Sequence, residues 1–182
     1  LIAADEIDFG FVTLRDGQKT NDEYIPIAQE ELVLILPSSH PFCAKAVKGD
    51  GPYPELDPSL LKNEPFAMMY RTSTVYECVE EILSAAGVVP YILFESPRAF
   101  TILEMVSSNM CCGIIPDSPA IHRPQGVSVF CLPGHPSWTF AASYRKGTHL
   151  PKVSRHFIKL ASDYWTGAMA ALHRKDQENR VS

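Results

Sequence analysis

The chain has 182 residues and a formal net charge of −5, and 46% of its residues are hydrophobic and 20% charged. This composition is ordinary for a soluble globular protein of one domain or two small lobes. The negative charge argues against a chain that binds the phosphate backbone of nucleic acid by itself. No apolar run reaches the about 18 residues of a membrane span.

The first part of the chain reads as strands separated by turn-rich loops. Ile7, Phe9 and Phe11 alternate with Asp8 and Gly10, which is a strand pattern. In chain order, we expect a strand at residues 7–13, a loop at 14–23, a buried strand at 32–36, a long proline-rich loop at 37–58 with a helical turn at 58–61, and a strand at 65–70.

The middle of the chain carries two helix-then-strand patterns. The first helix is capped by Thr72 or Ser73 and stopped by Gly87. The second begins after Ser96 and ends at Asn109, which tolerates the left-handed conformation. The apolar faces that define the two helices are Val75, Cys78, Val79, Ile82, Leu83 and Ala86 in the first, and Phe100, Ile102, Leu103 and Val106 in the second. Short strands are expected at 91–94 and 111–116.

The last part is expected to hold two strands and a helix. Residues 116–126 read as a loop, and residues 127–132 and 139–144 read as strands. A helix starts at Pro151, and after Gly167 the charged tail is expected to be frayed or disordered. The predicted apolar face of this helix consists of Val153, Phe157, Leu160, Ala161, Tyr164 and Trp165.

Strands that alternate with helices predict an open α/β sheet, which binds small molecules at the carboxyl ends of its strands. Tyr70-Arg71-Thr72-Ser73-Thr74 lies between a strand end and a helix start. Free N–H groups, hydroxyls and a guanidinium suit a carboxylate. Ser96 repeats this position at the next strand, and Thr13 ends the first strand. The alternative is that Thr72, Ser73 and Ser96 only cap helices and Arg71 is a surface charge.

The sequence predicts no catalytic site, metal site or cofactor. Five cysteines without C-x-x-C spacing fit neither a disulfide framework nor zinc, so they read as reduced, buried thiols. The histidines are scattered, and no nucleophile elbow, Walker loop or G-x-G-x-x-G is present. Cys43 near His40 reads as a loop cysteine beside a turn histidine rather than a reactive pair.

Five phrases, in order and at their spacing, resemble the effector-binding domain of LysR-type transcriptional regulators. The resemblance covers residues 4 to about 166. The phrases are DEIDFGFVT, EELVLILPSSHPF, ILSAAGVVP, MVSSNMCCGIIP and FAASYRKGTHLPKVSRHFIKLASDYW.

This resemblance implies a type 2 periplasmic-binding-protein-like fold with two α/β lobes and an effector in the cleft between them. Lobe I would be residues 1–27 with 130–170, lobe II residues 28–129, and 171–182 a charged tail. The crossing segments would be residues 24–29 and 127–132. The implied effector contacts are Thr13, Arg71, Thr72, Ser73, Thr74 and Ser96.

The resemblance also implies partners for the whole protein. We expect a cytoplasmic, non-enzymatic regulator that binds a small, carboxylate-like or other anionic effector and forms a homodimer or homotetramer. DNA would be bound only through an N-terminal helix-turn-helix that this chain lacks, and lobe I would be incomplete. Cys111 stands where the family usually has glycine, which is expected to close off space near the cleft.

A periplasmic-type solute-binding protein is the alternative reading, and an enzyme is a third. The lack of a basic, apolar, small-residue signal at the start, the free thiols and the family-like YRKGTHLP segment argue against the solute-binding reading. The lack of a catalytic set argues against an enzyme. An upstream helix-turn-helix would favour the regulator, and an upstream signal peptide the solute-binding protein.

Overall fold

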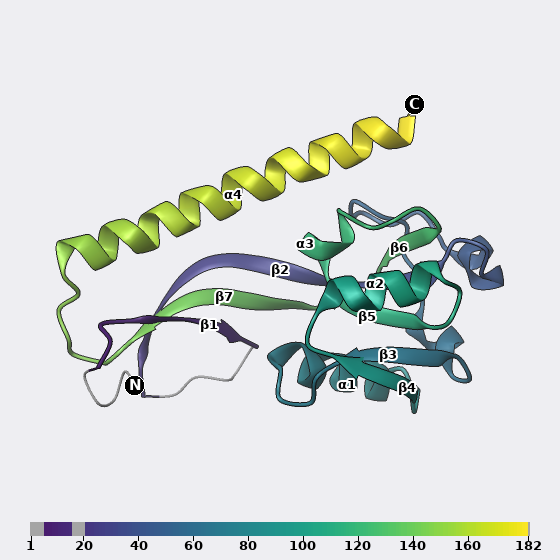
Figure 1. Ribbon diagram of the computed structural model, residues 1–182, viewed down its shortest axis with the longest axis horizontal. Helices are drawn as coiled ribbons and strands as arrows, with labels where there is room; N and C mark the ends of the chain where they lie inside the picture. Colours follow the sequence, from purple (N-terminus) through teal and green to yellow (C-terminus); the bar gives the residue numbers. More distant parts are fainter. Residues whose placement is uncertain (1–5, 16–20, 182) are drawn as a thin grey trace. The chain divides into compact units, whose positions relative to one another are not determined.

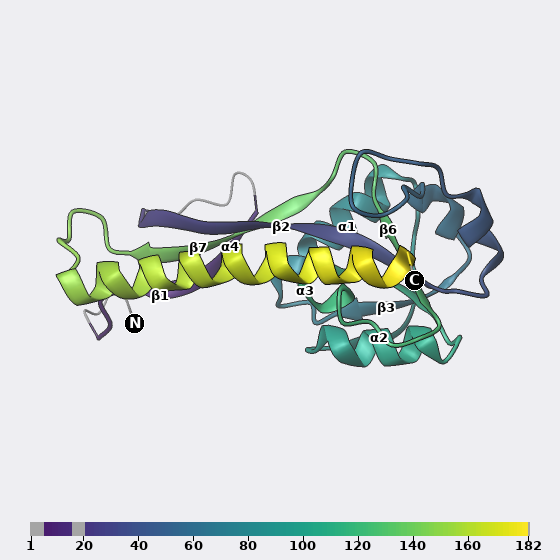
Figure 2. The same cartoon turned by 90° about the horizontal axis from the view of Figure 1, so that it is seen from above.

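A computed structural model describes residues 6–15 and 21–181, and the chain divides into two compact units (Figures 1 and 2). Unit 1 consists of Leu1–Glu30 and Trp138–Ser182, and unit 2 of Glu31–Ser137. The elements are β1 (Gly10–Leu14), β2 (Glu23–Pro37), η1 (Pro41–Lys45), η2 (Pro58–Leu61), β3 (Pro65–Met69), α1 (Thr74–Ala85), β4 (Tyr91–Ser96), α2 (Ala99–Ser107), β5 (Cys112–Pro116), α3 (Asp117–Ala120), β6 (Val127–Cys131), β7 (Ser137–Tyr144) and α4 (Lys152–Val181).

Unit 2 is built on a mixed sheet in the order β2-β5-β3-β4, with β6 paired to the other edge of β2. β3 runs parallel to β4 and β5, and β2 runs antiparallel to β5 and β6. The chain moves from β3 to β4 through α1, then returns past β3 to β5 through α2. Crossovers between parallel strands are right-handed. The β3–α1–β4 and β4–α2–β5 crossovers run in opposite directions across the sheet, so α1 and α2 lie on opposite faces of it (Figures 1 and 2).

The core of unit 2 follows from strand alternation. Side chains of successive strand residues point to opposite faces, and the predicted continuous apolar run is buried on both. One face packs Val33 and Ile35 of β2 against Ile102, Leu103 and Val106 of α2. The intervening residues of β2, Leu32, Leu34 and Leu36, are equally buried on the α1 face.

The predicted turn residues of unit 2 are confirmed. Ser73 is the N-cap of α1, and its hydroxyl accepts a hydrogen bond from Tyr76 N–H at 3.1 Å. Gly87 and Asn109 both adopt a positive φ, of 69° and 58°, directly after α1 and α2. Only Gly, and to a lesser degree Asn, tolerates that conformation at low cost.

Two predictions about unit 2 are wrong in detail. Ser96 does not cap α2; it ends β4, its hydroxyl closes a local turn with Arg98, and the helix starts at Ala99. Phe100 lies on the exposed side of α2 although its period fits the apolar face. Cys111 is buried in the core of unit 2, and its expected effect on the space near the cleft stays a prediction.

Unit 1 packs the last helix against an antiparallel sheet in the order β1-β7-β2. Its buried core consists of Ile27, Ala142, Leu150 and Ile158, with Phe140 and Trp165 packed against it. The Phe140 and Trp165 ring centroids are 5.2 Å apart. Polar contacts also hold α4 in place: Ser162 Oγ donates to Ile27 O of β2 at 3.5 Å, and Ser154 Oγ donates to Asp8 Oδ2, just before β1, at 3.3 Å.

The predicted apolar face of α4 is wrong at four of its six residues. Ala161 and Trp165 pack inward with Ile158, but Val153, Phe157, Leu160 and Tyr164 are each more than half exposed. Both stripes have helical spacing, and the stripe with Ile158 is the one that packs against the sheet. The tail predicted to be frayed after Gly167 instead continues α4 as far as Val181.

The segments expected to cross between lobes belong to two strands. Residues 24–29 are the first part of a single long β2, within unit 1. Residues 127–131 form β6, which pairs with Val33–Pro37 of β2 inside unit 2. The chain passes between the two compact units at Glu30/Glu31 and Ser137/Trp138. The expected lobe boundaries stay a prediction.

Among the residues that the structure describes, none of the helices combines the length and the apolar character required to span a bilayer.

Candidate functional site

The predicted binding loops lie next to each other at the carboxyl ends of two parallel strands of unit 2. Met69 at the end of β3 is paired in parallel register with Ser96 at the end of β4. The loop after β3 leads to α1, and the loop after β4 leads to α2. In open α/β sheets, small molecules bind outside the carboxyl ends of the strands.

Arg71 reaches across this point to β4. Its Nε donates to Glu95 Oε1 at 2.9 Å, and its guanidinium carbon lies 5.9 Å from the centroid of the Tyr76 ring. The hydrogen bond to Glu95 raises the pKa of the Arg71 guanidinium above its ordinary value, so the group is a permanent cation. Arg71 remains largely exposed, which leaves its other N–H groups open to solvent.

The neighbouring hydroxyl groups differ in their hydrogen bonding and their exposure to solvent. Ser73 Oγ donates to Tyr70 O at 2.7 Å and accepts from Tyr76 N–H, so it already acts as a cap. Thr72 is exposed beside it, and Thr74 is the first residue of α1. Ser73 therefore acts as a helix cap in this structure.

The two remaining predicted contacts lie elsewhere. Ser96 is buried, and its hydroxyl both accepts from Arg98 N–H at 3.1 Å and donates to Arg98 O at 3.2 Å. Thr13 lies in β1 of unit 1, where it pairs with Phe140 of β7. The structure thus brings Arg71, Thr72, Ser73, Thr74 and Ser96 to one edge of the unit 2 sheet.

Two open cavities of unit 2 lie away from this edge. One, of about 460 Å³, is lined by residues of η1 and of the loop before η2, with Phe130 of β6. The other, of about 310 Å³, lies between Pro58, Ala86 and Leu132. Neither is lined by a predicted contact residue.

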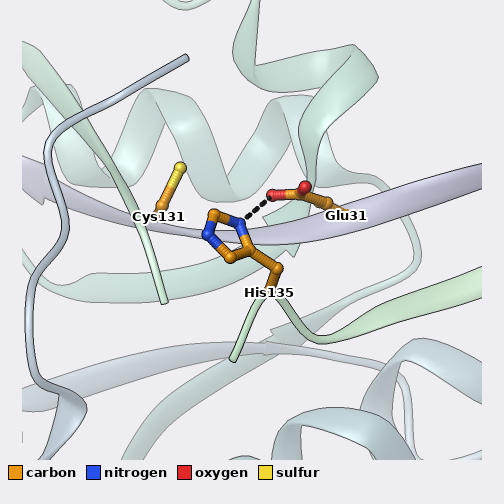
Figure 3. Close-up of side chains that lie close together, drawn as sticks. All are labelled: Glu31, Cys131 and His135. Carbon is orange, nitrogen blue, oxygen red and sulfur yellow. Dashed lines mark hydrogen bonds and ion pairs between the residues drawn. The ribbon is translucent and has the colours of Figure 1, made fainter. Parts of the chain in front are cut away.

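A second cluster, missed by sequence reasoning, consists of Glu31, Cys131 and His135 (Figure 3). Their ligand atoms all lie within 4.8 Å of one another. His135 Nδ1 and Glu31 Oε2 are 3.0 Å apart. The spacing Cys131-x-x-x-His135 was the available signal, but the third member lies 100 residues earlier in the sequence.

The other thiols are structural. Cys43 Sγ donates to Pro37 O at 3.4 Å, and the nearby His40 ring pairs with Glu64 at 3.3 Å. Burial raises the pKa of the Cys111 thiol to about 11, and burial raises the pKa of Cys112 still further. All five cysteines are free, as the sequence predicts.

Comparison with known proteins gives consistent matches. The family described as LysR substrate binding domain matches residues 1–166. An uncharacterised HTH-type transcriptional regulator of Bacillus subtilis (strain 168), YwbI, is 27% identical over 163 residues, which cover 87% of this chain and 50% of that protein. The chain thus spans about half the length of this curated relative.

Solved structures agree on the fold. The regulatory domain of CcmR from Synechocystis PCC6803 in complex with 2-PG has a TM-score of 0.73 at 15% identity, covering 89% of this chain and 75% of that one. The effector binding domain of QuiR in complex with shikimate has a TM-score of 0.70 at 16% identity, covering 90% and 74%. The predicted type 2 periplasmic-binding-protein-like α/β fold is confirmed.

Proposed function

We propose a function from one premise: the chain belongs to the LysR substrate-binding domain family. Its role is to bind a small-molecule effector for a transcriptional regulator. The effector is an anion, held at the carboxyl ends of β3 and β4 by Arg71 and the start of α1. The observation that carries this proposal is the position of Arg71, an exposed cation at the carboxyl ends of the parallel strands β3 and β4.

The local chemistry favours an anionic ligand. Arg71 offers several N–H donors in a planar fork, which fits a carboxylate or phosphate. The start of α1, a 12-residue helix, adds the positive end of the helix dipole. The exposed Thr72 hydroxyl can donate a further hydrogen bond. Shikimate, the ligand named for the related QuiR domain, is itself a carboxylate.

The Arg71 guanidinium can exchange its partner Glu95 for an anionic ligand. In this structure, the Glu95 carboxylate occupies one side of the guanidinium. An anionic ligand must share or replace this partner, and the ion pair that it replaces is exposed to solvent and therefore contributes little. The pair thus orients Arg71 at little cost to ligand binding.

The remaining assignments concern the whole protein. We infer two regulatory lobes that approximate units 1 and 2, cytoplasmic location, and a homodimer or homotetramer. DNA is bound through a helix-turn-helix outside the matched residues, as the description of the Bacillus subtilis relative suggests. Ser96 and Thr13 are secondary contacts. Ser96 would have to exchange its bonds to Arg98 to reach a ligand.

A thermal-shift screen with organic carboxylates, including shikimate, tests the effector proposal. A ligand at one hundred times its Kd stabilises the folded state by about 2.7 kcal/mol, which raises the melting temperature measurably. We expect Arg71→Ala to remove the shift produced by the best ligand. Lys62→Ala, which removes an exposed cation beside η2, serves as the matched control and should retain it. An unchanged shift in Arg71→Ala would contradict the proposal.

A gel-shift assay tests whether DNA is bound by residues outside this chain. With its charge of −5, the chain alone should give no sequence-specific shift with the operator of the whole protein. A specific shift, competed by unlabelled operator but not by random DNA, would show that DNA is recognised within these residues.

A further inference from the structure

We propose that Glu31, Cys131 and His135 form a binding site for a divalent transition-metal ion of the zinc class. The ligands are a carboxylate oxygen, the thiolate sulfur and an imidazole nitrogen, and water completes the coordination. The site lies wholly within unit 2. It is independent of the effector proposal, because it shares no residue with the Arg71–Thr74 loop.

Backbone hydrogen bonds hold the three residues in place. Leu32 N–H donates to Pro136 O at 2.8 Å, which fixes the residues next to Glu31 and His135 beside each other. Two backbone hydrogen bonds hold Cys131 in place. Its N–H donates to Pro54 O at 2.8 Å, and its carbonyl accepts from Leu56 N–H at 3.0 Å. The three side chains therefore converge from a pre-formed backbone (Figure 3).

The turn that presents His135 is unusual. His135 N–H donates to Leu132 O at 3.1 Å across Pro133 and Gly134, which is the residue pattern of a type II turn. His135 itself then adopts φ 48°, in the left-handed region. A non-glycine residue held in that region costs about 1 kcal/mol or more. This conformation directs the ring toward Cys131 and Glu31.

Gly51 keeps the site open on another side. A Cβ built at Gly51 would lie 2.6 Å from Cys131 Sγ and 3.0 Å from the Cε1 atom of His135. The absence of a side chain at this position therefore lets the thiol and the imidazole lie next to each other. Any larger residue would push apart the two groups that we assign as ligands.

The donor set selects the class of metal. A thiolate and an imidazole suit zinc and the later first-row ions, whereas magnesium and calcium prefer oxygen ligands alone. In a tetrahedral zinc site with bonds of about 2.0–2.3 Å, ligand atoms lie about 3.3–3.8 Å apart. Glu31 and His135 have side chains that are 37% and 36% exposed, so both can rotate to close the present spacing.

A thiol–imidazole–carboxylate set could instead make a reactive cysteine. Burial argues against that use, because Cys131 is fully buried and burial raises the pKa of its thiol. A reactive cysteine needs a lowered pKa and access to its partner. A metal ion removes the difficulty, because it binds the thiolate and displaces the proton to solvent.

Titration of the reduced, metal-free chain with Zn²⁺ and Co²⁺ tests the site. Calorimetry should show binding of about one Zn²⁺ per chain, with proton release from the thiol. Co²⁺ should give a thiolate-to-metal absorption band that Cys131→Ser lacks. Glu31→Gln and His135→Asn should each weaken binding by about tenfold or more. Asn is chosen because it tolerates the left-handed backbone of position 135.

A second histidine–carboxylate pair provides the matched control. His40 and Glu64 are 3.3 Å apart in the same unit, and His40→Asn retains a side chain able to accept from Phe42 N–H. Together with Cys43→Ser, this variant should bind metal as the unaltered chain does. Failure of the unaltered chain to bind Zn²⁺, or binding that none of the three cluster variants weakens, overturns the proposal. If Cys131→Ser misfolds, Glu31→Gln and His135→Asn still decide it, because both change half-exposed side chains.

Discussion

At Gly113, α2 approaches the sheet of unit 2 so closely that no larger residue fits. A Cβ built there would lie 2.9 Å from Ile102 Cγ2 and 3.2 Å from Ala67 O. The neighbouring side chain and a strand carbonyl both limit the space, and the carbonyl belongs to β3, next to β5 in the sheet. A single missing methyl group thus lets α2 seat Ile102, Leu103 and Val106 on β5.

We predict that Gly113→Ala lowers the free energy of unfolding by about 1–3 kcal/mol, because an overpacked core forces the helix or Ile102 to move. Gly167→Ala is the matched control. Gly167 lies within α4 with nothing within 4 Å of an added Cβ, so alanine should be neutral or stabilise by up to about 1 kcal/mol. Urea denaturation measures both. Equal effects of the two substitutions would contradict this account of Gly113.

At the scale of single elements, α1 links the stability of unit 2 to the proposed effector site. Ser73 caps the helix through Tyr76 N–H, and Arg71 lies two residues earlier in the same loop. A ligand at this helix start would therefore meet a loop that is already ordered by the cap. Ordering the loop in advance reduces the entropy cost of binding.

Two substitutions at Ser73 separate capping from ligand binding. Ser73→Ala should cost about 1 kcal/mol of stability, because it leaves the Tyr76 N–H without the side-chain acceptor. Ser73→Asp should keep most of that stability, since Asp is a good cap, but its charge should repel an anionic effector. Denaturation and ligand titration of both variants check this. Tight effector binding by Ser73→Asp would argue for a neutral or cationic ligand.

At the scale of elements, the helix ends could be predicted from the sequence, but the contacts between distant segments could not. Gly87 and Asn109 mark helix ends because backbone sterics are local. The exposed stripe of α4 could not be distinguished from its buried one, since Phe157 and Ile158 both fit helical spacing and only tertiary contacts choose between them. The same applies to Glu31 and His135, which backbone pairing brings together across 104 residues.

On the whole molecule, the exposed stripe of α4 is an unpaired apolar surface. Val153, Phe157, Leu160 and Tyr164 recur at steps of three and four and are each more than half exposed. Phe11 of β1 adds a further exposed ring 6.0 Å from Phe157. A contiguous apolar surface of this kind favours association in water.

We predict that the chain self-associates in a concentration-dependent way and that Leu160→Glu shifts it toward monomer, because a charge in an apolar contact is costly to desolvate. Tyr91→Glu, which places a charge on an exposed apolar position of unit 2, is the control and should leave the association unchanged. Light scattering coupled to size exclusion measures the mass. A stable monomer at all concentrations would contradict the prediction.

The central claim is that Arg71 holds an anionic effector in competition with Glu95. Isothermal titration of the best carboxylate from the thermal screen tests it most directly in three proteins: the unaltered chain, Arg71→Ala and Glu95→Gln. The account predicts that affinity falls by about tenfold or more without the guanidinium and is retained or raised when the competing carboxylate is neutralised. Equal affinity in all three proteins, or a loss in Glu95→Gln that matches the loss in Arg71→Ala, would contradict it.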